Sequence, residues 1–130
     1  GATPASAVIK LAALGLKGEV LMAQGDLDRA IDAFRAGVAI EDQNNYTEPP
    51  DWAQPMRHYL GDALLRAKRP AEAEAVYRRD LRWNQNNGWS LYGLHQALLV
   101  QQKTAEADTV YSQWQQAWLM ADITLTASHL

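Results

Sequence analysis

The chain repeats part of its own sequence at a spacing of 34 residues. A shift of this length superposes four pairs of identical residues: Leu60 on Leu94, Leu64 on Leu98, Ala73 on Ala107, and Tyr77 on Tyr111. Self-similarity with a period of roughly 20–50 residues is typical of proteins that stack one small structural unit on the next. The repeat therefore predicts successive similar units, each of which buries its apolar face against a neighbour.

The spacing of apolar residues predicts that each unit is a pair of helices. Apolar residues recur at helical intervals in six stretches, and none shows the two-residue alternation of a half-buried strand. We expect helices at residues 6–23, 27–40, 52–67, 70–83, 88–101 and 104–121. Turn and capping residues stand at the breaks, among them Gly25-Asp26, Asp51, Pro70 and Thr104. The sequence thus predicts an all-α fold of three antiparallel hairpins.

One segment interrupts the 34-residue spacing. The corresponding alanines of the first two units, Ala30 and Ala73, are 43 residues apart, and the surplus of nine coincides with a segment that contains Pro49-Pro50. Adjacent prolines oppose a helix, so we place repeats at 6–40, 52–84 and 87–121, with an inserted loop at 41–51, in a single domain. We expect this loop to be a spacer with Trp52 wedged at the junction; the alternative is a flap with Tyr46 as a contact.

The residues at the repeated positions are of a consistent kind. The second unit has leucine and glycine on its first helix, then alanine and an aromatic residue on its second: Leu60, Gly61, Leu64, Ala73 and Tyr77. The first unit has Gly18, Leu21, Ala30, Phe34 and Gly37, whereas the third has His95 in place of the small residue and Gly93 two positions earlier. This pattern resembles the tetratricopeptide-repeat (TPR) family. The resemblance implies an α-solenoid of about three antiparallel hairpins with a C-terminal capping segment.

Two longer strings, residues 46–65 and 86–98, are similar to the C-terminal ends of large bacterial proteins of the same repeat class. This second resemblance implies that the chain is part of a longer repeat protein. It implies no activity.

The TPR resemblance also implies where a partner binds. In this family partners usually lie along the concave face formed by the first helix of each pair. The corresponding groove residues, with one flanking tryptophan, are His58, Asp62, Leu65, Arg66, Trp89, Tyr92, Gln96 and Leu99. A receptor for chaperone C-terminal carboxylates is not expected, since Asp62 stands where an amide is needed. The resemblance therefore implies a protein- or peptide-binding scaffold; the alternative is a structural module that self-associates through solenoid ends.

No combination of residues predicts catalysis. The chain has no cysteine, its eight glycines are scattered, and its serines stand in no nucleophile-elbow context. His58 and Asp62 lie four residues apart and could offer two ligands to a divalent metal. No further ligand accompanies them, so we favour an ordinary surface pair. We expect no enzyme, no metal and no cofactor.

Charge and hydropathy argue against nucleic-acid and membrane partners. The 12 basic and 15 acidic residues give a net charge of −3, and neither sign is gathered in a block. No stretch reaches the roughly 20 apolar residues of a membrane span, and residues 1–10 lack the pattern of a signal peptide. The cellular compartment stays open.

The five tryptophans are candidates for either core packing or binding. Trp114 and Trp118 lie four residues apart on the last predicted helix, and we expect them to cover the last open core face. Trp52 and Trp89 open the first helices of the second and third units. For these two, burial and service as binding anchors are about equally supported.

Overall fold

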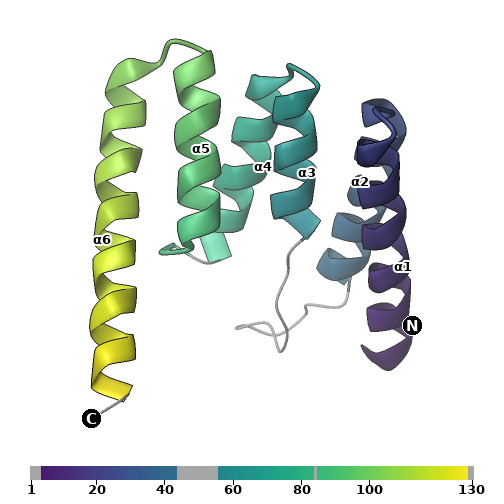
Figure 1. Ribbon diagram of the computed structural model, residues 1–130, viewed down its shortest axis with the longest axis horizontal. Coiled ribbons are helices and arrows are strands. Elements are labelled where there is room, and N and C mark those ends of the chain that lie inside the picture. Colours follow the sequence, from purple (N-terminus) through teal and green to yellow (C-terminus); the bar gives the residue numbers. More distant parts are fainter. Residues whose placement is uncertain (1–3, 44–55, 84, 129–130) are drawn as a thin grey trace. The chain divides into compact units, whose positions relative to one another are not determined.

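The computed structural model describes residues 4–43, 56–83 and 85–128, and these ranges are helical apart from short turns. The helices are α1 (Pro4–Ala23), α2 (Leu27–Gln43), α3 (Met56–Arg66), α4 (Pro70–Trp83), α5 (Gly88–Val100) and α6 (Thr104–Ser128) (Figure 1). The predicted all-α class is confirmed, and the predicted bounds of α4 agree at both ends. The two interpretations of the inserted loop depend on Trp52 and Tyr46, which lie outside the described residues.

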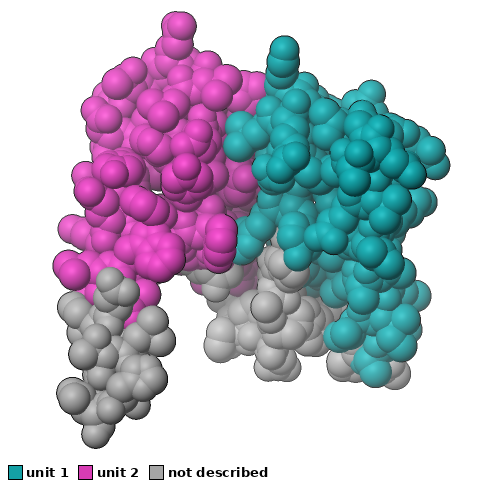
Figure 2. All heavy atoms as spheres, viewed as in Figure 1, with its two compact units in different colours: residues 1–69 teal, residues 70–130 magenta. Residues whose placement is uncertain are grey.

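The chain divides into two compact units, residues 1–69 and 70–130 (Figure 2). In the first unit α2 packs against both α1 and α3, and in the second α5 packs against both α4 and α6. Neighbouring helices in the sequence are therefore neighbours in space within each unit, as expected for helical hairpins. The single repeat domain with units at 6–40, 52–84 and 87–121 stays a prediction.

Helix α2 extends further than the sequence predicted. Residues 41–43, expected to begin the inserted loop, form its last turn. Glu41 is completely buried there, and its Oε1 accepts a hydrogen bond from the backbone N–H of Met56 (3.1 Å), the first residue of α3. Arg57 donates to the Asp42 carboxylate at 2.8 Å. Amides at a helix N-terminus lack intrahelical acceptors, so these carboxylates stabilise the start of α3 and hold the last turn of α2 in place.

Helices α1, α3 and α5 end in the same backbone motif. Each is followed by a residue of positive φ: Gly25 at 79°, Lys68 at 61° and Gln102 at 63°. The N–H groups of these residues bond to carbonyls three positions back, and the N–H groups of the next residues bond to carbonyls five positions back, all at 2.8–3.1 Å. This is the Schellman arrangement. Because Lys68 and Gln102 are 34 residues apart, the sequence period recurs in the backbone geometry.

Small residues on one helix make room for aromatic rings of a neighbouring helix. In the first unit Phe34 is completely buried, and a Cβ added to Gly18 would lie 2.3 Å from its Cε1. In the second unit the buried ring of Tyr77 covers Gly93, where an added Cβ would lie 2.2 Å from Cζ. The repeated alanines are also completely buried, namely Ala30, Ala73 and Ala107. The residues at the repeated positions therefore serve close packing between helices.

A charged cluster joins α4 to the turn between α5 and α6. The carboxylate of Glu74 accepts hydrogen bonds from Arg78 Nε (2.8 Å), Gln101 Nε2 (2.9 Å) and Lys103 Nζ (3.0 Å). Burial alone would raise the pKa of Glu74, but these three donors outweigh it and lower the pKa to about 2. Glu74 is therefore ionised at neutral pH and ties the three helices of the second unit together.

Candidate binding site

Four of the predicted groove residues lie on α3. His58, Asp62 and Leu65 are half-buried and Arg66 is exposed, whereas the opposite side of the helix, with Leu60 and Leu64, is buried. The carboxylate of Asp62 pairs with Arg66 at 3.1 Å, an exposed contact of a kind that contributes little to stability. In the described parts of the chain, no group of three or more potential metal ligands lies together. The helix thus presents a mixed polar and apolar face.

The other four predicted residues lie on α5. Trp89, Tyr92 and Leu99 have 76%, 47% and 43% of their surface exposed, and Gln96 is half-buried. The opposite side of α5 contains the completely or nearly completely buried Leu91, Leu94, Ala97 and Leu98. Each set of four therefore shares a face of its own helix. That both sets line one groove stays a prediction.

The start of α5 is held firmly in position. Asn87 caps the helix, because its side-chain oxygen accepts hydrogen bonds from the backbone N–H groups of Trp89 (3.0 Å) and Ser90 (3.4 Å). The buried carboxylate of Asp80 on α4 accepts from the Ser90 hydroxyl and from the Asn87 amide. These contacts anchor the backbone that carries Trp89, although its indole is exposed.

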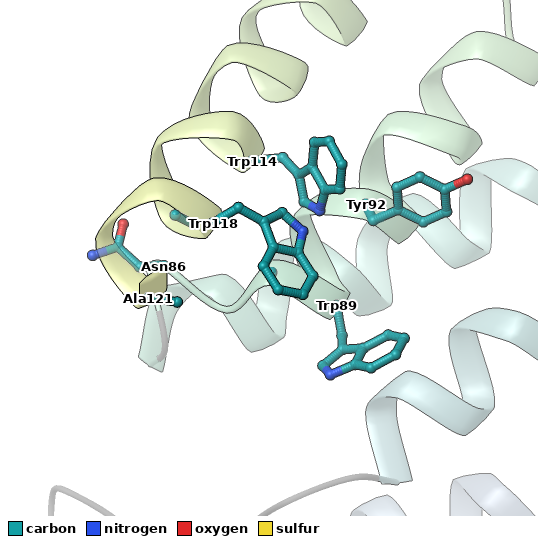
Figure 3. A pocket seen from close by; sticks show the side chains of 8 residues that line it. Asn86, Trp89, Tyr92, Trp114, Trp118 and Ala121 are labelled. Atoms are coloured by element: carbon teal, nitrogen blue, oxygen red, sulfur yellow. The ribbon is translucent and has the colours of Figure 1, made fainter. Parts of the chain in front are cut away.

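An aromatic pocket of about 390 Å³ opens between the start of α5 and the middle of α6 (Figure 3). Its walls are mostly aromatic or small residues: Asn86, Gly88, Trp89, Tyr92, Trp114, Ala117, Trp118 and Ala121. Trp114 is half-buried and 52% of Trp118 is exposed. The prediction that both tryptophans cover the core is therefore wrong for Trp118 and only partly met by Trp114, since both rings border the pocket.

The rings around the pocket support one another. Tyr92 and Trp114 have their centroids 5.7 Å apart, and Trp114 meets Trp118 edge-on at 6.2 Å with an angle of 83° between the planes. On the far side Trp114 stacks on Tyr111 at 5.5 Å and 29°. Such pairs each contribute about 0.5–1.5 kcal/mol beyond simple burial. Tyr92, Trp114 and Trp118 therefore form one connected group of rings in the pocket wall.

His95 contacts this ring cluster. The first hairpin has Gly18 at the same repeat position, and Gly18 makes room for Phe34. The Nδ1–H of His95 donates to the carbonyl of Ala107 (3.1 Å), and its ring lies 5.2 Å from that of Tyr111. Tyr111 is 40% exposed, whereas Phe34 is completely buried. Trp114 stacks on this exposed ring.

The polar groups of the aromatic pocket are mainly hydrogen-bond donors. The indole N–H of a tryptophan can only donate, the Tyr92 hydroxyl and the Asn86 amide can donate or accept, and none of the described wall residues is charged. These described walls therefore suit an uncharged apolar ligand that carries acceptor oxygens.

A second hollow, of about 580 Å³, lies over another side of the same unit and is more polar. Amide side chains and two arginines surround an apolar floor: Arg78, Leu81, Arg82, Gln85, Asn86, Leu91, Leu94, Val110, Gln113 and Gln116. Arg78 is already engaged by Glu74 and by Glu106, the latter at 2.8 Å. This leaves the aromatic pocket as the better-defined site.

Neither a protein-family model nor a curated protein matches this chain. None of the described helices combines the length and the apolar character that crossing a membrane requires. The sequence contained a signal for the pocket, because Trp89 and Tyr92 lie three residues apart and Trp114 and Trp118 lie four apart. It did not indicate that these two pairs would meet.

Proposed function

We propose that this chain is a protein- or peptide-binding scaffold of the TPR type, in which α3 and α5 each offer an outward face to a partner. The observation that carries the proposal is the face of α5 with Trp89, Tyr92 and Leu99. This helix packs against a neighbour on two sides, yet its third side exposes two aromatic residues and a leucine. Large rigid side chains of this kind are preferred anchors in protein interfaces.

Two further features support a repeat scaffold. The Schellman turns after α1, α3 and α5 repeat the same backbone geometry, and the buried alanines Ala73 and Ala107 recur at the 34-residue period. Repeat proteins of helical hairpins use the exposed side of one helix in each pair to bind extended ligands. A chain with this architecture and no charged block is suited to a peptide rather than to nucleic acid.

A selection from a displayed library of random dodecapeptides tests the proposal. The wild-type protein should enrich a family of related peptides, and Leu99→Ser should weaken their binding at least tenfold, because it removes an apolar anchor from the α5 face. Leu119→Ser is the matched control, since Leu119 is an exposed leucine of α6 outside both the predicted groove and the pocket. Equal binding by wild type and Leu99→Ser would contradict the proposed surface.

A second candidate function is self-assembly through apolar helix faces. Helix α1 exposes four large aliphatic residues, and α6 exposes a cluster of three large residues: Val8, Ile9, Leu16 and Val20 on α1, and Trp118, Leu119 and Met120 on α6. Heterologous contact between two different faces of this kind produces chains of subunits. Light scattering over a hundredfold concentration range would reveal it as a mass that rises with concentration, and a constant monomer mass would exclude it.

A further inference from the structure

We infer that the aromatic pocket of α5 and α6 binds a proline-rich segment of a partner protein in the polyproline II conformation. The inference rests on the peptide-binding function proposed above and names the class of peptide. The pocket includes Trp114 and Trp118, which do not belong to the predicted groove. It shares Trp89 and Tyr92 with the α5 face and extends that face onto α6.

The size of the pocket favours a short stretch of chain over a single small group. Cavities of roughly 300–1,000 Å³ hold ligands of drug size, and this one measures about 390 Å³. A lone ammonium or methylated ammonium group would fill only a small part of that space. A polyproline II helix advances about 3.1 Å per residue, so a few residues of such a chain fit between the walls.

The hydrogen-bonding groups of the pocket match proline in particular. The indole N–H groups of Trp89, Trp114 and Trp118 are donors, and the described wall residues include no carboxylate. Proline has a backbone carbonyl and no N–H, so a proline-rich segment brings acceptors and leaves no donor unsatisfied. Its carbonyls are also free, because polyproline II has no internal hydrogen bonds. A helical partner would hide its carbonyls, and a charged peptide would find no counter-charge among the described wall residues.

The arrangement of the rings also suits this ligand. Trp114 and Trp118 stand at 83° to one another, and Tyr92 lies 5.7 Å from Trp114. Proline rings pack against aromatic side chains in aromatic-lined grooves. A polyproline II segment is stiff before it binds, so it loses little conformational entropy on binding.

The test is titration of the purified chain with an acetylated and amidated nonaproline peptide, followed by tryptophan fluorescence and by calorimetry. We expect saturable binding, at least tenfold weaker binding by Trp118→Ala and by Trp89→Ala, and no more than a twofold change for Trp83→Ala. Trp83 is an exposed tryptophan of α4 outside the pocket, so Trp83→Ala removes the same kind of side chain at a position that should not contact the peptide. Trp118 and Trp89 are both more than half exposed, and circular dichroism will verify that the variants keep their helices.

Three results would overturn the inference. The first is that the folded wild type does not bind nonaproline at millimolar peptide concentration. This result overturns the inference whether or not the protein binds tetramethylammonium, which stands for a methylated ammonium ligand. The second is equal affinity for a nonapeptide of alanine, glycine and serine, and the third is binding that survives both Trp118→Ala and Trp89→Ala. If nonaproline fails while displayed peptides sensitive to Leu99→Ser are still selected, only this inference falls. If no peptide of either kind binds, the proposed function falls with it.

Discussion

Replacing Gly93 by alanine tests the packing on which the second unit depends. Gly93 is buried on α5 beneath the ring of Tyr77, and a Cβ built there would lie 2.2, 2.5 and 2.7 Å from three ring atoms. Ordinary contact begins at 3.4 Å, so the ring would have to move by about 1.2 Å. The ring is 4% exposed and has no free space to enter, because protein cores are close-packed.

Two effects of opposite sign determine how much Gly93→Ala changes the free energy of unfolding. Overpacking a core costs about 1–3 kcal/mol, whereas glycine to alanine within a helix gains up to about 1 kcal/mol. Gly88→Ala separates them, because nothing lies within 4 Å of a Cβ at Gly88 and its φ is not positive. We expect Gly93→Ala to lower the free energy of unfolding by about 1–2 kcal/mol relative to wild type, and Gly88→Ala to leave it unchanged or slightly raised.

Urea unfolding followed by circular dichroism measures both variants. At this chain length 1 kcal/mol also corresponds to a shift in Tm of roughly 3–5 °C. Tyr77→Leu provides the decisive second mutation: in its background the extra methyl group meets no ring, so Gly93→Ala should cost little, and the double-mutant cycle should show coupling of about 1 kcal/mol or more. The reasoning would be refuted if Gly93→Ala were as stable as Gly88→Ala, or if its cost were the same with and without the ring.

Three further predictions concern the charged cluster, a turn and a cap. Glu74→Gln should destabilise the chain by roughly 1–2 kcal/mol at pH 7, since the partners of Glu74 are partly exposed and screened. The pKa of Glu74 is lowered from 4.5 to about 2, so its contribution to the free energy of unfolding is present above pH 4.5 and lost between pH 4.5 and 2. Thermal unfolding across this pH range should show the Tm values of wild type and Glu74→Gln converge. Lys68→Gly should raise the free energy of unfolding in urea by about 0.5–1 kcal/mol, because glycine accepts the positive φ of this position without strain. A loss of stability would count against the Schellman turn after α3. Asn87→Ala should cost about 0.5–2 kcal/mol by removal of the α5 cap, and unchanged stability would show that the cap is dispensable.

Much of the fold followed from local patterns. The helical spacing of apolar residues, together with Pro70 and the turn residues, was sufficient for the class, for the number of helices in the described ranges, and for the bounds of α4. The 34-residue period identified the buried positions, including Ala73 and Ala107. These features depend on residues close together in the sequence, or on repetition of one pattern, and both are visible without coordinates.

The wrong prediction for the end of α2 has a physical cause. Residues 41–43 were expected to leave the helix because prolines follow, but Glu41 is held by the backbone of Met56, 15 residues away. A carboxylate buried at the start of another helix outweighs the local preference for a turn, and local sequence contains no sign of that contact. The adjacent prolines act only on the residues immediately before them.

The sequence by itself determined which residues of each helix are apolar and therefore which faces must be buried or bound by a partner. The tertiary structure alone decided what those faces meet. The third hairpin has His95 where the first has Gly18, and Phe34 is completely buried whereas Tyr111 is 40% exposed and carries Trp114 stacked on it. The period of a helix specifies a direction for each side chain, but whether a neighbour fills that direction depends on the volumes of side chains from other helices. For this reason two tryptophans that the pattern assigned to the core border a pocket instead.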